Sequence, residues 1–154
     1  MINNIPCLKF TNRGSIFMDT AQSNKKLIEA FCTQVIINHD MSNLYQFIRE
    51  DYIQHNADCP QGRDGFIEFF TTIFQAVPDF SYSIKQIIAE GDFVWVYSRT
   101  TGTHTGIPWL GVHPSGKRLD FDVIDMFRLQ DGKIAEHGDV ADTYTFFSQL
   151  GRFQ

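Results

Sequence analysis

Two carboxylates and an imidazole near the end of the chain have the types and spacing needed for acid–base chemistry. Asp125 lies on one arm of an expected hairpin, and His137 and Asp139 lie on the other arm. A three-residue loop ending in Gly132 suits a type I turn with a bulge, in which glycine takes the left-handed conformation. With that loop, paired residue numbers sum to an even value, so the three side chains share one sheet face with Phe127. A two-residue loop would reverse this parity and separate Asp125 from His137.

Such a face could remove a proton from a carbon next to a carbonyl. If the face is concave and covered by helices, burial raises the pKa of a carboxyl, and a second nearby carboxylate acts in the same direction. A carboxyl that titrates nearer neutrality is suited to proton abstraction. The alternative is a solvated face on which Asp125, His137 and Asp139 simply contact water. The opposite face of the hairpin would carry Met126, Arg128, Ile134 and Glu136.

Other side chains could complete a pocket. His104 lies between Gly102 and Gly106 at the end of an expected strand, where it could take part in chemistry or be satisfied by backbone groups. His55 follows an expected helix and could either line a cavity or lie in a surface turn. Trp109 is apolar for a connecting segment, so it either shields a pocket or packs against a partner.

No motif in the sequence indicates a cofactor. The nucleophile elbow, the P-loop, the dinucleotide-binding glycine motif and the HExxH motif are all missing from it. Imidazole and carboxylate suit several divalent ions. A metal site could be built from His55, His104, His137 and Asp139. Because the His-x-Asp spacing alone gives such a site little support, we expect neither a metal nor a cofactor.

The elements that would position these residues change character halfway along the chain. Apolar residues at helical spacing predict three helices, the third with a broad phenylalanine stripe that includes Phe70. These helices cover residues 23–37, 43–48 and 63–76, and residues 51–56 receive no element. Alternating and β-branched patterns predict strands over 80–84, 93–103, 119–129 and 134–141, with a short amphipathic tail over 144–150. Helices followed by consecutive antiparallel strands predict one α+β domain.

Composition narrows the classes of function. A chain of 154 residues with 43% hydrophobic residues can bury the core of a single domain, which we place over 20–154 after a loose leader over 1–19. With 13 basic against 18 acidic residues and no basic cluster, nucleic-acid binding is not expected. The apolar runs are far shorter than the roughly 20 residues that span a bilayer, so no membrane association is expected. Three cysteines without CxxC spacing indicate a reducing, cytoplasmic setting.

Several short motifs follow one another in order along the second half of the chain. They are Gly102-Thr-His104-Thr-Gly106, Trp109-Leu-Gly111, Pro114-Ser-Gly116-Lys-Arg118, Asp125-Met-Phe127-Arg128 and Asp131-Gly-Lys-Ile134-Ala-Glu136-His137. Together they resemble the SnoaL-like polyketide cyclases of the nuclear-transport-factor-2-like superfamily. Tyr52-Ile-Gln-His55-Asn56 and Gly65-Phe-Ile-Glu-Phe-Phe70 look like relatives described as SnoaL-like aldol-condensation enzymes. The resemblance covers roughly residues 22–150.

The resemblance implies both a fold and a reaction. The fold would be α+β, with a cone-shaped, curved antiparallel sheet closed by the N-terminal helices around an apolar pocket, and with homodimers formed through the sheet. The cyclases of this family close a ring by an intramolecular aldol step without a cofactor, and their acid–base aspartate matches Asp139. Their second pocket residue is a histidine where this chain has Asp125, and many relatives carry a bulky tryptophan at Gly138. His104 matches a histidine that many members keep.

We therefore expect a cofactor-independent acid–base enzyme that acts on a small, apolar, carbonyl-containing or polyketide-like molecule. Asp139 would remove a proton, and His137, His104 or a protonated Asp125 would donate to the enolate oxygen. The side chains expected to contact substrate are His55, Trp109, Phe127 and Phe70. Two alternatives stay open: a non-catalytic small-ligand-binding module of the same fold, and an isomerase or hydrolase that uses the same pocket.

Overall fold

The computed structural model describes residues 13–153, with side chains from Thr20 onward. In chain order the elements are α1 (Arg13–Phe31), η1 (Cys32–Ile37), α2 (Leu44–Phe47), β1 (Ile48–Gln54), α3 (Gly62–Ala76), β2 (Ser81–Glu90), β3 (Phe93–Thr103), β4 (Arg118–Gln130), β5 (Lys133–Ala141) and α4 (Thr143–Leu150). Helix α1 therefore begins inside the segment expected to be a loose leader, whose first part, residues 1–12, lies outside the described residues. Within the described part of the chain, no helix is long and apolar enough to cross a membrane.

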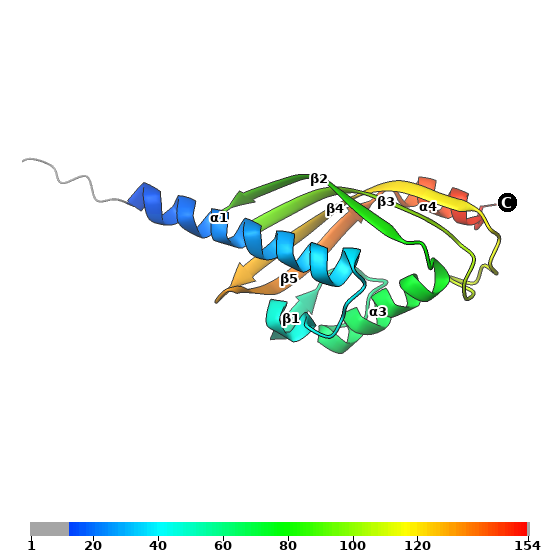
Figure 1. Cartoon of the computed structure of the whole chain (residues 1–154), viewed down its shortest axis with the longest axis horizontal. Helices are drawn as coiled ribbons and strands as arrows, with labels where there is room; N and C mark the ends of the chain where they lie inside the picture. Colours follow the sequence, from blue (N-terminus) through cyan, green and yellow to red (C-terminus); the bar gives the residue numbers. More distant parts are fainter. Residues whose placement is uncertain (1–12, 154) are drawn as a thin grey trace, which may run out of the picture.

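Five strands form one curved, open sheet in the order β1-β5-β4-β3-β2 (Figure 1). Strands β2 to β5 pair antiparallel with their chain neighbours, as expected, whereas β1 pairs in parallel with β5. The sequence patterns gave no strand at β1 and placed Ile48 in the preceding helix. This strand is held by partners distant in sequence: Ile48 lies opposite Ile134, and Gln54 lies opposite His137. That pairing brings the end of β1 to the centre of β5.

Helices α1 and α3 lie along one face of the sheet (Figure 1), which we call the inner face. Phe31 of α1 is the centre of the core, because its ring contacts those of Phe47, Phe66 and Phe127 at centroid distances of 5.7–5.9 Å. Such aromatic contacts add to the free energy gained by burying the rings. A second apolar cluster forms where α4 packs on Leu119 and Phe121 of β4. Two clusters thus cover the two ends of the inner face.

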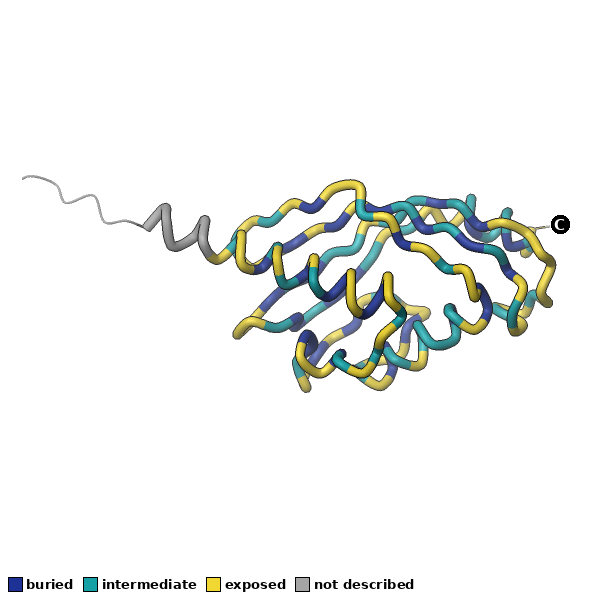
Figure 2. The backbone as a smooth tube through the Cα atoms, viewed as in Figure 1, coloured by how far each residue is buried: buried dark blue, intermediate teal, exposed yellow. Residues whose placement is uncertain are grey.

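Strand β3 shows why the two faces of the sheet differ. Its side chains alternate between exposed and buried along most of its length, as the tube in Figure 2 displays. Val94 and Val96 are buried on the inner face, whereas Phe93, Trp95 and Tyr97 are exposed on the other face, which we call the outer face. The period of two predicted this alternation. The outer face is unusually aromatic for an exposed surface.

The β4–β5 hairpin has the expected pairing around Asp125, but its turn and its strand β5 differ from the prediction. Its turn has two residues, Asp131 and Gly132, both with positive φ, which is typical of a type I′ turn. The predicted three-residue loop is therefore wrong. A bulge at Ala135 adds one residue on β5 and restores the even parity, so Asp125 pairs with Asp139. The two-residue turn places Ile134 opposite Leu129, and both side chains lie in the core, which corrects the expected place of Ile134 on the outer face.

Candidate active site

A cavity of about 170 Å³ lies between the helices and the inner face of the sheet. Its walls are largely apolar and come from α3, α4, the loop before β4 and the strands. Its polar groups gather where β1, β4 and β5 run side by side. Those that matter below are Gln54, Asn56, Asp125, His137 and Asp139. A polar cluster in an otherwise apolar cavity is the usual arrangement of a small-molecule site.

Asp125 and His137 form a buried pair held by further hydrogen bonds. His137 Nε2 lies 3.0 Å from Asp125 Oδ1, and the Tyr82 hydroxyl donates to Asp125 Oδ2 at 2.6 Å. Burial and the negative charge of Asp125 raise the pKa of Tyr82, so this hydroxyl keeps its proton. On the other side of the imidazole, Gln54 Nε2 lies 3.1 Å from His137 Nδ1. All four groups are thus engaged with one another.

Asp139 lies beside this chain of hydrogen bonds and has one oxygen free. Asn56 Nδ2 donates to Asp139 Oδ1 at 2.7 Å, and the Asn56 amide is oriented because its Oδ1 accepts from the backbone N–H of Asp58 at 2.8 Å. Among residues 20–153, no group donates to Asp139 Oδ2. The carboxyl lines the cavity, so its free oxygen is available to a bound molecule.

Burial is the main reason that the pKa of Asp139 is raised above its ordinary value. The hydrogen bond from Asn56 and any positive charge on His137 act in the opposite direction, while the charges of Asp125 and Asp58 add to the increase. The expectation that a carboxyl on this face is shifted upward is met at Asp139. A raised pKa makes the ionised carboxylate a stronger base.

The structure brings together only part of the expected site. Asp125, His137 and Asp139 converge, and Phe70 and Trp109 line the cavity. Phe127 of β4, which was expected to contact substrate, lies behind the wall of this cavity. Phe127 stacks on His137 with ring centroids 4.8 Å apart and lines an adjoining space of about 20 Å³.

Two of the expected site histidines lie away from the cavity. His104 is fully buried, its Nε2 lies 3.0 Å from the backbone oxygen of Ile107, and it does not line the cavity. His55 faces the outer side of the sheet, where its Nε2 lies 2.7 Å from Glu136 Oε2. A Cβ on Gly138 would come within 3.2 Å of His55 Cβ, so the imidazole of His55 takes the space that a large residue 138 would need. The structure therefore places neither His104, the expected proton donor, nor His55, the expected substrate contact, in the lining of the cavity.

Three residues of the polar cluster were missed from the sequence: Gln54, Asn56 and Tyr82. The position of Gln54 and Asn56 could have been predicted from the segment Tyr52-Ile-Gln-His-Asn56. If this segment is read as an extended strand, every second side chain points to the inner face. The same rule points His55 outward. Tyr82 was recognised only as an apolar strand residue, and its hydroxyl gave no hint of a partner on β4.

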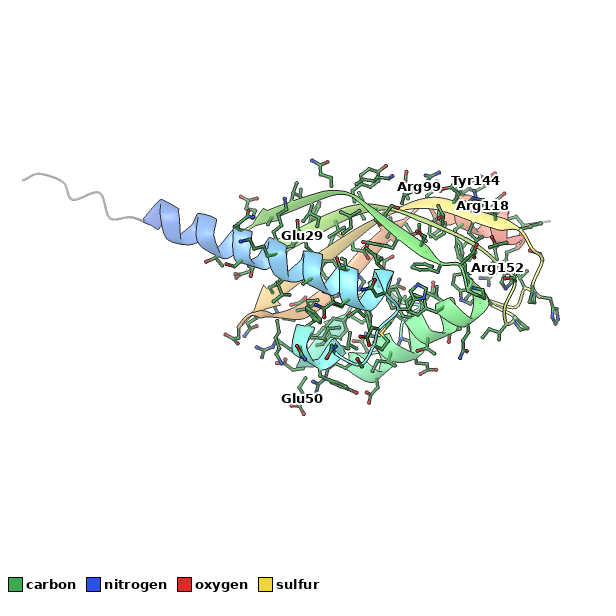
Figure 3. All side chains as sticks on the ribbon, viewed as in Figure 1. Glu29, Glu50, Arg99, Arg118, Tyr144 and Arg152 are labelled. Carbon is green, nitrogen blue, oxygen red and sulfur yellow. The ribbon has the colours of Figure 1, made fainter. Side chains whose placement is uncertain are left out.

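Basic side chains lie outside the cavity. Within the described part of the chain, the lining contains neither lysine nor arginine but does contain Asp58, Asp125 and Asp139. Arg118 and Arg152 lie at the α4 end of the molecule (Figure 3), and neither reaches the lining. The four groups weighed as metal ligands do not converge, and among residues 20–153 no three His, Cys, Asp or Glu side chains are arranged so that they could hold a metal ion.

Comparison with known proteins places these features in a family. The family model of the SnoaL-like polyketide cyclases matches residues 26–150. Aklanonic acid methyl ester cyclase DauD of Streptomyces sp. (strain C5) is 25% identical over 129 residues, which span 82% of this chain and 78% of DauD. The cyclase DnrD of Streptomyces peucetius, which bears the same enzyme name, is 25% identical over 134 residues, covering 82% of this chain and 87% of DnrD.

A solved structure agrees with the sequence relatives. TsrD from Streptomyces laurentii superposes with a TM-score of 0.77 and 26% identity over 86% of this chain and 97% of TsrD. The superposed fold and the match of the family model over most of the chain agree with each other. The chain belongs to the SnoaL-like polyketide cyclase family.

Proposed function

We propose that this chain is a cyclase that closes a ring in a polyketide-like substrate by an intramolecular aldol step, with Asp139 as the base. The observation that carries the proposal is the free Oδ2 of Asp139, on a partly buried carboxyl of raised pKa that faces the cavity. A general base needs an open lone pair within reach of the substrate and a pKa suited to the pH of the reaction. The cyclases DauD and DnrD support the reaction class.

The enolate oxygen needs a hydrogen-bond donor, and Asn56 is the best placed. Its Nδ2 carries two hydrogens, of which Asp139 takes one, so the other remains for a substrate oxygen beside the base. His137 is a weaker candidate than we expected from the sequence, because both of its ring nitrogens already have partners. Both oxygens of Asp125 are already engaged, Oδ2 by the Tyr82 hydroxyl and Oδ1 by His137 Nε2.

The proposed reaction is balanced without a cofactor. Asp139 takes a proton from the carbon next to a substrate carbonyl, and Asn56 donates to the resulting enolate oxygen. The enolate carbon attacks a second carbonyl of the same molecule, which forms the new carbon–carbon bond and leaves an alkoxide. Protonated Asp139 returns its proton to that alkoxide, so substrate and product are isomers. The apolar walls keep water away from the enolate.

The charges of the lining favour a neutral substrate. A carboxylate in the cavity would face Asp58, Asp125 and Asp139 without a lysine or arginine partner among the described lining residues. The phenylalanine-rich walls suit an aromatic or largely apolar molecule. We therefore propose an esterified or otherwise uncharged polyketide. Cys32 and Cys59 are free, buried thiols, which fits a reducing, cytoplasmic setting.

The test is to incubate the protein with aklanonic acid methyl ester and, separately, with the free acid, and to follow ring closure by liquid chromatography and mass spectrometry. We expect conversion of the ester, much weaker conversion of the acid, and no effect of EDTA. Deuterium uptake from heavy water without ring closure would instead indicate an isomerase that uses the same base. Failure to convert or deuterate neutral polyketide esters would reject the enzyme and favour a binding module.

We also propose that two copies pair through the outer face of the sheet. Its exposed apolar residues are neighbours across the strands: Ile88 lies opposite Trp95, Tyr97 opposite Ile124, and Ile124 opposite Val140. A contiguous apolar surface of this kind usually marks an interface. Light scattering after size exclusion should show a dimer that Trp95→Glu converts to a monomer, whereas Tyr144→Glu, at an exposed aromatic on α4, should leave it intact. A monomeric wild type contradicts the proposal.

A further inference from the structure

We infer that Gln54 is a positioning residue that fixes His137 as the neutral tautomer with its proton on Nε2, so that the imidazole donates to Asp125 next to the proposed base. The tautomer follows from hydrogen-bond geometry alone. Its consequence for catalysis rests on the proposed function of Asp139. Gln54 lines the cavity at the end of β1, directly opposite His137 on β5.

The Gln54 amide has only one orientation that satisfies its neighbours. Its Oε1 accepts from the backbone N–H of Asn56 at 2.9 Å, and a backbone N–H can only donate. Its Nε2 must therefore point the other way, 2.9 Å from the Tyr52 hydroxyl and 3.1 Å from His137 Nδ1. The backbone of residue 54 is also held on both sides, since its N–H donates to Gln61 Oε1 and its oxygen accepts from Gln61 Nε2. The amide is clamped in place.

An amide NH2 facing the imidazole determines where the imidazole proton lies. Gln54 Nε2 has no lone pair to offer, so His137 Nδ1 must be the acceptor and carry no hydrogen. The single ring proton is then on Nε2, which points at Asp125 Oδ1 at 3.0 Å. A second proton on the imidazole would make His137 Nδ1 a donor that faces the N–H of Gln54 Nε2, and two donors repel each other. Two nearby aspartates would by themselves favour a charged histidine, and Gln54 opposes that outcome.

The neutral state of His137 matters for the charge that Asp139 experiences. A neutral imidazole does not cancel the negative charge of Asp125, which pairs with Asp139 across the strands. An imidazolium two residues away on the same face would instead lower the pKa of Asp139. The titratable groups facing this part of the cavity are Asp125, Tyr82, Tyr52, Cys32, Asp58 and Cys59. None of these six groups can carry a positive charge. Among the titratable groups that face this part of the cavity, His137 is therefore the one that could bring a positive charge close to Asp139.

The variant Gln54→Glu reverses the polarity at nearly constant shape. Its carboxylate can still accept from the Asn56 N–H, but it now accepts from His137 Nδ1–H as well. We expect the ring of His137 to become doubly protonated. The matched control is Gln86→Glu, which makes the same change of charge at an exposed position on β2.

The decisive measurement is nitrogen-15 NMR of the imidazole rings between pH 5 and pH 8, with His137→Asn used to assign the signals. In the wild type and in Gln86→Glu we expect one protonated and one unprotonated ring nitrogen at His137, unchanged across this range. In Gln54→Glu both nitrogens should be protonated. A wild-type His137 that is charged near pH 6, or that carries its proton on Nδ1, overturns the inference. The wild-type spectrum alone decides the tautomer, so a Gln54→Glu protein that fails to fold does not remove the test.

Activity then separates this inference from the proposed function. If the wild type converts the neutral ester, Gln54→Glu should lower kcat more than it raises KM. The acid limb of its pH profile should move to lower pH, because an imidazolium at position 137, on the same sheet face as Asp139, lowers the pKa of that carboxyl. A pH profile identical to that of the wild type would contradict the catalytic role of Gln54. A wild type with the expected tautomer but no turnover would instead reject the proposed function and leave the tautomer assignment standing.

Discussion

Strand β5 carries two histidine–carboxylate contacts, one on each face of the sheet. On the inner face, His137 lies 3.0 Å from Asp125, with side chains 7% and 13% exposed. On the outer face, Glu136 lies 2.7 Å from His55, with side chains 27% and 56% exposed. The outer contact is the shorter, yet the inner pair is the one joined to the cavity. Distance therefore does not distinguish a pair that lines the cavity from a surface pair, whereas burial and further partners do.

Two carboxyl groups on β5, Glu136 on the outer face and Asp139 on the inner face, have pKa values that are shifted in opposite directions. The pKa of Glu136 is lowered by its hydrogen bonds to His55 and Arg128. The pKa of Asp139 is raised, chiefly by burial. Both shifts follow from which face each side chain takes, and the strand period assigns that face. A chemically similar side chain thus becomes a surface ion-pair partner or a candidate base according to the parity of its position.

The largest expected effect in this comparison is that of Asp139→Asn. Loss of a general base usually lowers turnover by about 10²- to 10⁴-fold. We expect a loss in this range for conversion of the neutral ester, with KM little changed. In the wild type, kcat/KM should fall as the pH drops through the raised pKa of Asp139, which lies above the ordinary aspartate value of about 3.9. The control is Asp92→Asn, in the exposed turn between β2 and β3. Turnover within tenfold of the wild type in Asp139→Asn would show that another group is the base.

The same variant should not destabilise the fold. Because the pKa of Asp139 is raised in the folded protein, ionising this carboxyl costs stability at every pH above the pKa of the unfolded chain. Asparagine removes that cost and can still accept from Asn56. The free energy of unfolding of Asp139→Asn at pH 7 should equal or exceed that of the wild type, and the difference should vanish below about pH 4. A less stable variant at pH 7 would contradict the raised pKa.

An intermediate effect is expected for Tyr82→Phe, which removes one of the two donors to Asp125. A buried hydrogen bond to a charged group contributes about 1.5–3 kcal/mol, and its loss should appear in urea unfolding. The outer face offers a matched control. The Tyr97 hydroxyl donates to Asp122 at 3.1 Å in a position exposed on the single chain, so in the Trp95→Glu background, which keeps the outer face uncovered, Tyr97→Phe should change stability very little. Equal effects of the two substitutions would mean that burial of the inner network adds nothing.

The sequence predicted the parts of this arrangement that depend on local periodicity. Alternation on β3 and the shared face of Asp125, His137 and Asp139 were both predicted correctly. The parity was nevertheless reached through two compensating errors, because the turn is one residue shorter than expected and a bulge at Ala135 restores the register. A bulge depends on packing between strands, which local patterns do not carry.

Contacts between distant segments could not be predicted in the same way. Gln54 meets His137 only because β1 pairs in parallel with a strand about eighty residues further along the chain. Tyr82 reaches Asp125 across the curved sheet, and nothing in its local pattern indicates a carboxylate partner. His104 differs in another way: its flanking glycines and the family resemblance suggested a functional position, whereas the structure places the ring in the interior, next to a backbone oxygen and outside the cavity lining. The site is therefore richer in amide and hydroxyl groups than its acids and histidines suggested.

The smallest effect in the comparison is expected on the outer face. Exposed ion pairs typically contribute no more than about 1 kcal/mol. A double-mutant cycle of His55→Ala and Glu136→Gln should give a coupling energy in that range, and turnover of the ester should stay unchanged in all three variants. Because the pKa of Glu136 is lowered in the folded protein, its contribution should be present above the ordinary glutamate pKa and be lost as the pH falls through the lowered value. A turnover loss in Glu136→Gln as large as that of Asp139→Asn would show that the outer face also contributes to turnover. The distinction between the inner and the outer histidine–carboxylate pair would then be wrong.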